Sequence, residues 1–168
     1  LKVTLKDSTV NLISFNVKPE DMSTSLLLDN VALMVNDEGD YYYPSYDIDQ
    51  IVNFEQSEGY QVLISGNTQE TLDLTGMPVS LHTSITLEAY KRNMVPYLPE
   101  DSLTASEVFE YYTNILLVKN DEGEYYVPSQ GIDQIVMYPG RGYYVFLTGE
   151  NDIDFKYPLA GSNRILDT

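Results

Sequence analysis

The passage "NDEGDYYYPSYDIDQIV" runs from Asn36 to Val52, and "NDEGEYYVPSQGIDQIV" runs from Asn120 to Val136. Direct alignment of Asn36–Phe54 with Asn120–Tyr138 gives 13 identical residues of 19. Self-similarity at a fixed spacing is typical of repeated structural units. A catalytic centre rarely needs to be duplicated within so short a chain. The repeat therefore predicts one folded unit made twice.

The similarity extends in both directions along the chain. "EGYQVLISG" (58–66) matches "RGYYVFLTG" (141–149), "NLISF" (11–15) matches "NMVPY" (93–97), and "VTL" (3–5) matches "ITL" (85–87). We therefore expect two tandem modules, residues 1–79 and 80–168. A module of about 80 residues buries only about 60–65% of its unfolded surface and is marginal alone. The chain has no cysteine for a disulfide, so the copies are expected to pack on each other or on neighbours.

Turn residues and apolar runs predict a hairpin in each module. Gly39 and Gly123 end the "NDEG" turns, where positive φ favours glycine. Pro44 and Pro128 are expected to end the returning strands, because proline has no N–H to donate to a sheet. The alternating segments "GYQVLIS" and "GYYVFLT" predict further strands. We expect "TLDL" (71–74) and "IDFKY" (153–157) to pair with them.

One short helix is expected in each module, which makes the fold class mainly β with short helices (a β-rich α+β protein). Thr104 and Glu107 form a capping-box pattern before apolar residues at helical spacing. "STSLLL" (23–28) is the counterpart in the first module. "IDQIV" is ambiguous between a strand and a helical turn, and we favour a tucked turn whose Ile48 and Ile51 seal the edge of the sheet.

The overall charge limits the partners. With 26 acidic and 9 basic residues the formal net charge is −17, which repels phosphate backbones and anionic membranes. We expect no nucleic-acid partner. No apolar run approaches the roughly 20 residues of a membrane span, and no basic-then-apolar leader opens the chain. Since Leu1 already begins a strand-like segment, we expect a processed chain or a part of a longer one.

The order of these motifs resembles a β-rich repeat module of large secreted and cell-surface bacterial proteins, especially from Bacteroidota and marine lineages. The matching pieces are "NLISF"/"NMVPY", "NDEGDYYYP"/"NDEGEYYVP", the two "IDQI" and "EGYQV"/"RGYYV". The tryptophan usual before "NLIS" is replaced by Val10 and Arg92, which leaves room for a divergent branch such as a phage structural protein. The resemblance implies a spacer, adhesive or assembly role, and it carries no catalytic residues.

Catalysis is a weak interpretation of this sequence. His82 is the sole histidine, and it stands in the link between the modules without a nucleophile motif. Paired carboxylates suited to glycoside hydrolysis are an alternative, but the repeated acids fall in turns, where Asp is favoured for backbone reasons. We therefore expect no enzyme activity and no cofactor.

Calcium is the better chemical alternative, because this hard cation takes six to eight oxygen ligands. Acidic residues crowd the turn of each module, although the spacing is not that of an EF-hand and Gly131 replaces Asp47. The candidates are Asp37, Asp40, Asp49, Asp121, Glu124 and Asp133. The competing interpretation is a solvated acidic rim around an ordinary turn.

Fifteen tyrosines suggest either cross-strand packing or a contact surface. The candidates for an interface are Tyr41, Tyr43, Tyr60, Tyr125 and Tyr143. Without tryptophan a glycan platform is less convincing than protein contact, so the expected partners are other protein chains or neighbouring modules. The leading hypothesis is a non-enzymatic, extracellular spacer or assembly module of a bacterial surface protein. The alternatives are a virion component of a phage, or a calcium- or glycan-dependent adhesin.

Overall fold

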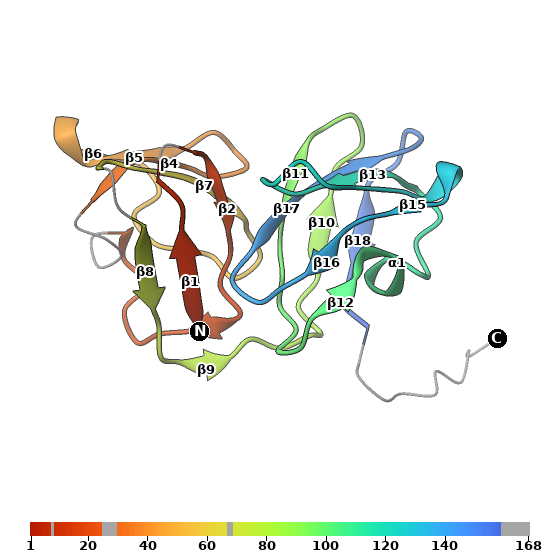
Figure 1. The fold of residues 1–168 in the computed structure, drawn as a ribbon, viewed down its shortest axis with the longest axis horizontal. Helices are drawn as coiled ribbons and strands as arrows, with labels where there is room; N and C mark the ends of the chain where they lie inside the picture. The colour runs from red at the N-terminus through yellow and green to blue at the C-terminus, as the bar shows by residue number, and fades with distance from the viewer. Residues whose placement is uncertain (8, 25–29, 67–68, 159–168) are drawn as a thin grey trace.

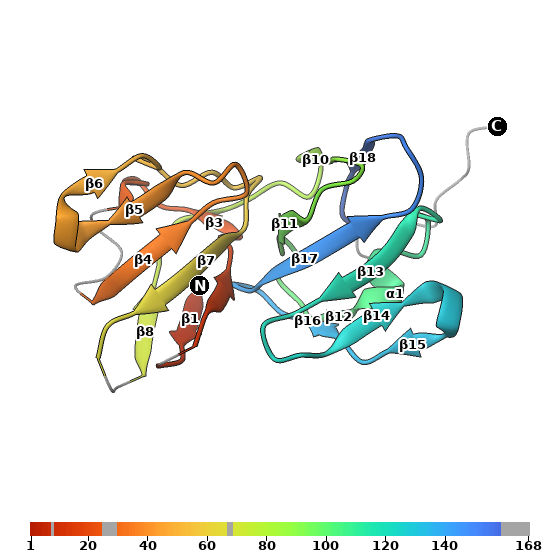
Figure 2. The same ribbon diagram turned by 90° about the horizontal axis from the view of Figure 1, so that it is seen from above.

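The structure is a computed structural model that describes residues 1–158 except 8, 25–29 and 67–68. The described chain is mainly β, built from several small antiparallel sheets. The described parts of its first half (residues 1–79) and of its second half (residues 80–158) lie side by side, as Figures 1 and 2 show. The predicted fold class is thus confirmed as mainly β.

The first half is organised around a five-stranded sheet in the order β2-β7-β4-β5-β6, beside two two-stranded sheets, β1-β8 and β3-β9. Its strands are β1 (Lys2–Leu5), β2 (Asn11–Ile13), β3 (Val17–Lys18), β4 (Val31–Val35), β5 (Tyr41–Tyr43), β6 (Ile48–Asp49), β7 (Tyr60–Ile64), β8 (Glu70–Asp73) and β9 (Met77–Pro78). The 3-10 turn η2 (Pro44–Tyr46) joins β5 to β6.

The second half has a five-stranded sheet in the order β11-β17-β13-β14-β15 and two-stranded sheets β10-β18 and β12-β16. The five-stranded sheet and β10-β18 repeat the first half, whereas β12-β16 corresponds there to the isolated bridge between Ser23 and Asn53 and not to β3-β9. The elements of the second half are β10 (Ile85–Leu87), β11 (Asn93–Pro96), β12 (Leu103–Thr104), α1 (Ala105–Val108), β13 (Ile115–Lys119), β14 (Tyr125–Val127), η3 (Pro128–Gln130), β15 (Ile132–Asp133), β16 (Val136–Met137), β17 (Gly142–Leu147) and β18 (Ile153–Phe155). The repeated passage therefore folds in the same way twice.

The "NDEG" turns close the hairpins β4–β5 and β13–β14 as predicted. Gly39 has φ +92° and Gly123 has φ +87°. The amide side chain of Asn36 accepts from the Asp40 N–H at 2.8 Å, and that of Asn120 accepts from the Glu124 N–H at 2.9 Å. A glycine and an asparagine thus fix each turn.

Proline ends β5 and β14 by beginning the 3-10 turns η2 and η3. Each turn closes on a left-handed residue, Asp47 with φ 55° and Gly131 with φ 64°. Asp and Asn tolerate this conformation better than most residues, and glycine adopts it freely. Asp47 in the first copy and Gly131 in the second copy therefore both suit the left-handed backbone that this position requires.

Three sequence-based expectations need correction. "TLDL" and "IDFKY" do not pair with β7 and β17, since β8 pairs with β1 and β18 pairs with β10. "IDQIV" begins as a two-residue edge strand, β6 or β15, and is not solely a tucked turn. The capping box of α1 is present, but the helix ends at Val108 and does not include Phe109, Tyr111 and Tyr112, whose spacing predicted that it would continue. Most of "STSLLL", the expected helix of the first half, lies outside the described residues.

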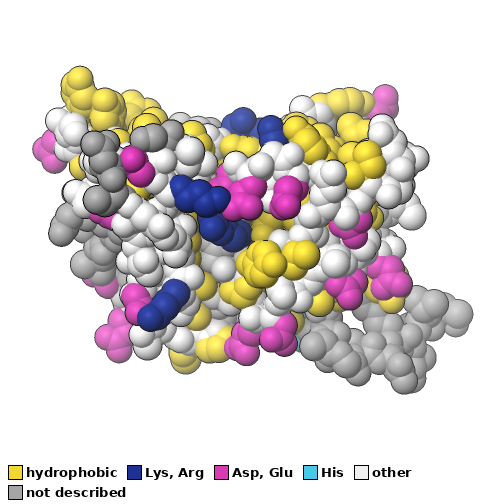
Figure 3. All heavy atoms as spheres, in the orientation of Figure 1, with side chains coloured by type: hydrophobic (Ala, Val, Ile, Leu, Met, Phe, Trp, Pro, Cys, Tyr) yellow, Lys and Arg dark blue, Asp and Glu magenta, His cyan; other side chains and the backbone are white. Residues whose placement is uncertain are grey.

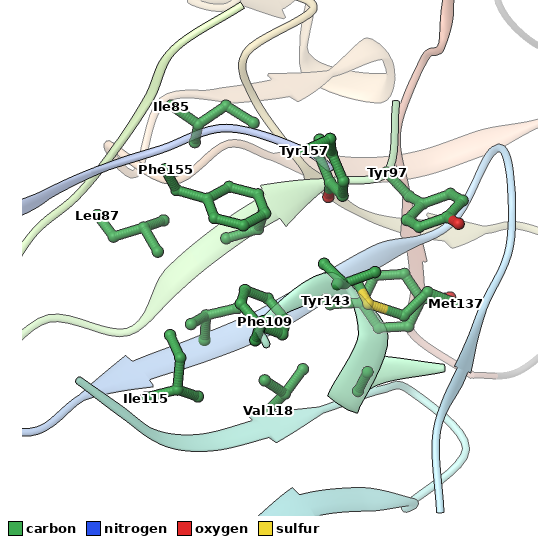
Figure 4. Close-up of a cluster of buried hydrophobic side chains, with 14 of the residues drawn as sticks. Ile85, Leu87, Tyr97, Phe109, Ile115, Val118, Met137, Tyr143, Phe155 and Tyr157 are labelled. Carbon is green, nitrogen blue, oxygen red and sulfur yellow. The ribbon is translucent and has the colours of Figure 1, made fainter. Parts of the chain in front are cut away.

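Each half has its own hydrophobic core. The first core gathers residues such as Phe15, Phe54 and Tyr60, whose rings lie 4.6–5.9 Å apart between centroids. In the second core Phe155 packs against Phe109 and Tyr157 at 5.1 and 4.8 Å (Figure 4). Aromatic packing therefore fills both interiors.

Replacing Gly123 by valine is expected to lower the free energy of unfolding by about 1–2 kcal/mol, because a β-branched residue is strained at positive φ. A Cβ at Gly123 would meet no atom within 4 Å, so the cost is conformational and not steric. Urea denaturation followed by tyrosine fluorescence measures it. An unchanged stability would contradict the role given to this turn.

Candidate functional site at the interface between the two halves

The two halves contact each other through equivalent residues. The Asp37 carboxylate accepts from the Met94 N–H at 3.0 Å, and the Asp121 carboxylate accepts from the Leu12 N–H at 3.0 Å. Asp37 and Asp121 occupy the same place in the two turns, and Leu12 and Met94 the same place in β2 and β11. The contact is reciprocal, as in the interface of a two-fold symmetric dimer.

Backbone bonds complete this interface. The Gly59 N–H donates to the Met94 carbonyl at 3.0 Å, and the Ser14 N–H donates to the Gly140 carbonyl at 3.1 Å. The Ser14 hydroxyl donates to the Arg141 carbonyl at 2.6 Å and accepts from the Tyr97 N–H at 2.9 Å. The outer edges of β2 and β11 are thereby paired with the opposite half, which protects them from other strands.

Two glycines allow the halves to approach closely. A Cβ at Gly59 would lie 3.1 Å from the Met94 carbonyl carbon and oxygen. At the equivalent Gly142 it would lie 2.9 Å from the carbonyl oxygen of Ile13. Both glycines therefore belong to the interface.

Charged side chains border the interface at two equivalent places, and their signs differ. We call the first place the balanced seam; it comprises Lys6, Asp121, Glu122 and Arg141. Here Lys6 pairs with Glu122, and the Arg141 guanidinium lies 3.7 Å from Asp121. The Lys6 ammonium lowers the pKa of Glu122. Figure 3 shows Lys and Arg beside Asp and Glu over the middle of one face.

The second place is the acidic seam, which comprises Asp37, Glu38, Glu58, Glu88 and Lys91. Lys91 lies 2.8 Å from Glu88 and 3.7 Å from Asp37. Burial, more than the charge of Glu38, raises the pKa of Glu58 to about 7. Burial likewise raises the pKa of Asp37, and Lys91 opposes it.

Each seam borders a small pocket. The pocket at the acidic seam has a volume of about 240 Å³ and is lined by Asp37, Glu38, Glu58 and Glu88 among others. The pocket at the balanced seam has a volume of about 250 Å³ and includes Asp121, Glu122 and Arg141. The first pocket therefore lies between the two halves, whereas the second is lined only by residues of the second half.

The six calcium candidates do not come together. Asp37 and Asp121 bind backbone amides across the interface, Asp49 accepts from the Thr24 hydroxyl, and Asp133 accepts from the Ser106 N–H at 3.4 Å. Asp40 and Glu124 lie in the two hairpin turns. Within the part of the chain that the structure describes, no group of three acidic, histidine or cysteine residues could hold a metal ion.

Tyr60 and Tyr143 need correction as interface candidates, because they are buried, 0% and 2% exposed. Their hydroxyls accept backbone N–H bonds from Glu55 at 2.7 Å and Tyr138 at 2.8 Å. Burial raises the pKa of both phenols. They are core residues whose hydroxyls bond to the backbone of the preceding loops and stabilise those loops.

The other tyrosine candidates stay accessible. Tyr41 and Tyr43 on β5 are half-buried, and Tyr125 on β14 is exposed beside the Lys119 ammonium, 5.7 Å from its ring centroid. The adjacent Tyr46, which the sequence analysis did not single out, is 67% exposed, and its ring lies 4.6 Å from that of Tyr43. We call Tyr41, Tyr43 and Tyr46 the tyrosine surface.

Sequence reasoning also missed Asn11 and Asn93, which are buried at equivalent positions. The Asn11 side chain bonds to the backbone of Lys6, Thr9 and Val62. The signal was present, since both asparagines begin a repeated motif, "NLISF" or "NMVPY". His82 is exposed in a turn, where its backbone N–H donates to the Ser80 hydroxyl at 3.2 Å.

Among the described residues no helix has the length and apolar character needed to cross a membrane. Comparison of the chain with models of protein families, with curated proteins and with solved structures found no match.

Proposed function

We propose that this protein is a non-enzymatic structural module, a spacer or assembly unit of a bacterial surface protein. The observation that carries the proposal is how the repeated polar residues are used. Asp37 and Asp121 accept backbone hydrogen bonds from the opposite half. The side chains of Asn11 and Asn93 bond to the backbone of the preceding loops. The Tyr60 hydroxyl accepts from the backbone of the loop before β7. These polar groups form hydrogen bonds that stabilise the fold, as buried polar groups in proteins usually do.

The reciprocal interface also supports this role. An interface made of the same surface on both sides is closed, so it joins two units and cannot propagate into a chain of many. Contacts with further modules or partners then use other surfaces. The tyrosine surface lies near the edge of the first five-stranded sheet that is opposite to β2. It is our candidate for a contact with a further module or partner, because tyrosines are enriched in protein interfaces.

Locating the protein in its source tests the proposal. Immunogold electron microscopy is expected to place the label on the outside of the producing cells. Label on phage particles would favour the virion alternative, and label confined to the cell interior would contradict both. A calcium-dependent rise in Tm or retention on a glycan array would instead favour the adhesin alternative.

Changing Tyr41, Tyr43 and Tyr46 to serine is expected to reduce incorporation of the chain into its native assembly at least tenfold, because a central aromatic cluster commonly contributes about 2 kcal/mol or more to binding. Quantitative immunoblotting of the purified assembly measures incorporation. The matched control is Tyr90→Ser/Tyr138→Ser, since these tyrosines are exposed elsewhere. Equal incorporation of both variants would contradict a contact role for the tyrosine surface.

A further inference from the structure

Each five-stranded sheet has an outward face that is largely apolar and contains no acidic residue. Opposite residues of paired strands point to the same side of a sheet, so the register separates the residues that meet the core from those that point away from it. The outward residues of the first half, which we call the first face, are Leu33, Val35, Tyr41, Tyr43, Gln61 and Leu63. The second face consists of the equivalent Leu117, Lys119, Tyr125, Val127, Tyr144 and Phe146.

Both faces are open to solvent on one side of the molecule. Neither hydrophobic core includes any of these residues, and each of them is half-buried or exposed. The five-stranded sheets form the upper side in Figure 1, with β1, β8, β10 and β18 beneath them, and Figure 2 looks onto this side. Apolar side chains gathered on an open surface mark contact sites.

The two faces meet at the interface between the halves. The Gln61 side-chain amide donates to the Met94 sulfur of the opposite half at 3.4 Å. Met94 in turn stands opposite Tyr144 in the register of β11 and β17. The first face therefore continues into the second face across the contacts that join the halves, so one partner can cover both faces at once.

The second face carries positive charge. The Lys119 ammonium lies 5.7 Å from the ring centroid of Tyr125, and the Arg92 guanidinium carbon, at the border of this face, lies 4.7 Å from that of Tyr144. Among the described residues neither cation belongs to an ion pair. Both charges are therefore available to a partner.

The first face has no cation and an acidic border. Val10 and Val35 stand where the second half has Arg92 and Lys119. The exposed Asp40 and Asp47 flank the tyrosine surface in the sequence. The first half holds 13 of the 26 acidic residues but only 3 of the 9 basic ones. The two faces of one chain are thus both apolar and are complementary in charge.

We propose that a second copy of the chain covers these faces, turned so that the first face of each copy lies on the second face of the other. The proposal rests on the contact role given above to the tyrosine surface, and it names the partner. Two second faces would bring the cations of both copies together, and two first faces would bring the acidic borders together. A first face on a second face instead sets tyrosine rings and carboxylates against cations. A two-fold axis forms both contacts at once, so the dimer is closed.

Sedimentation velocity over a concentration series tests the dimer. The mass is expected to rise with concentration towards twice the 19.1 kDa of one chain. The net charge of −17 opposes association at long range, and salt shortens that range from about 10 Å at 0.1 M to about 3 Å at 1 M. The dimer is therefore expected to be tighter at the higher salt concentration. The mass of a single chain at every protein and salt concentration would overturn the proposal.

The variant Val35→Lys is expected to raise the Kd of the dimer at least about tenfold, because it places a cation against the second face of the other copy. The fold accepts lysine here, since Lys119 occupies the equivalent position. The substitution also lowers the net negative charge, so a weaker dimer would not result from stronger overall repulsion. Met77→Lys is the matched control, because Met77 is 74% exposed on β9, away from both faces. Equal Kd values for the two variants would contradict the proposed contact.

A spin label tests the arrangement of the two copies. The chain has no cysteine, so Ser45→Cys, in the exposed turn η2 beside the first face, gives a single site for a nitroxide. A spin-labelled copy without isotope labels is mixed with an isotope-labelled copy of the unchanged chain. The NMR signals of β14 and η3 are expected to broaden more than those of β5 and η2. Stronger broadening of β5 and η2 would show that first faces meet each other and would overturn the arrangement.

Failure of the dimer can be distinguished from failure of the contact role. A chain that stays monomeric, while the variant with Tyr41, Tyr43 and Tyr46 changed to serine still fails to enter the native assembly, would show that the tyrosine surface binds a different partner. A chain that dimerises, while that variant enters the assembly normally, would support the dimer and contradict the contact role in the assembly.

Discussion

Replacing Asn93 by alanine is expected to lower the free energy of unfolding by about 3 kcal/mol, because each buried backbone group left without a partner costs about 1–3 kcal/mol. The Asn93 side chain donates to the carbonyls of Glu88, Lys91 and Val145 at 3.1–3.2 Å and accepts from the Glu88 N–H at 2.7 Å. It is 2% exposed. Urea denaturation measures the loss.

Two further variants are compared with Asn93→Ala, one at the equivalent buried position and one at an exposed position. Asn11→Ala is expected to cost a similar amount, because Asn11 makes the equivalent bonds in the first half. Asn151→Ala removes an exposed asparagine and is expected to change stability by less than about 0.5 kcal/mol. A cost for Asn93→Ala no larger than for Asn151→Ala would show that these bonds are replaced by water.

Replacing Gly142 by valine is expected to cost about 3 kcal/mol and to weaken the interface, because adding bulk to a close-packed contact forces the backbone to move. The added Cβ would lie 2.9 Å from the Ile13 carbonyl oxygen, which belongs to the opposite half. We expect faster hydrogen exchange at Ser14 and Leu12. Urea denaturation and NMR measure the two effects.

Gly123→Val, the same substitution at an open position, separates steric from conformational cost. At Gly123 the added Cβ meets nothing within 4 Å, so that variant is expected to lose stability without faster exchange at Ser14 or Leu12. If Gly142→Val left the exchange of these amides unchanged, the close approach of the halves through Gly142 would be wrong.

Local features of the fold were predictable from the sequence. The "NDEG" passages predicted both hairpins, and the positive φ of Gly39 and Gly123 is confirmed. The capping box of Thr104 and Glu107 is also confirmed. Each of these depends on residues within a few positions of one another, so the local backbone decides them.

Strand partners and burial were less predictable. "TLDL" and "IDFKY" pair with the first strands of their halves and not with β7 and β17, because alternation identifies a strand without naming its neighbour. The residues next to Tyr60 and Tyr143 in the sequence do not distinguish them from other tyrosines. Their burial depends on the tertiary packing of the two cores.

The sequence by itself determined a unit made twice, with its glycine-closed hairpins and its strongly acidic composition. Only the tertiary structure decided that equivalent aspartates cross to the opposite half, and that one seam is balanced in charge while the other holds four carboxylates. The physical reason is that a hairpin depends on neighbouring residues, whereas an interface brings together side chains up to 116 positions apart, as in the pair of Lys6 and Glu122.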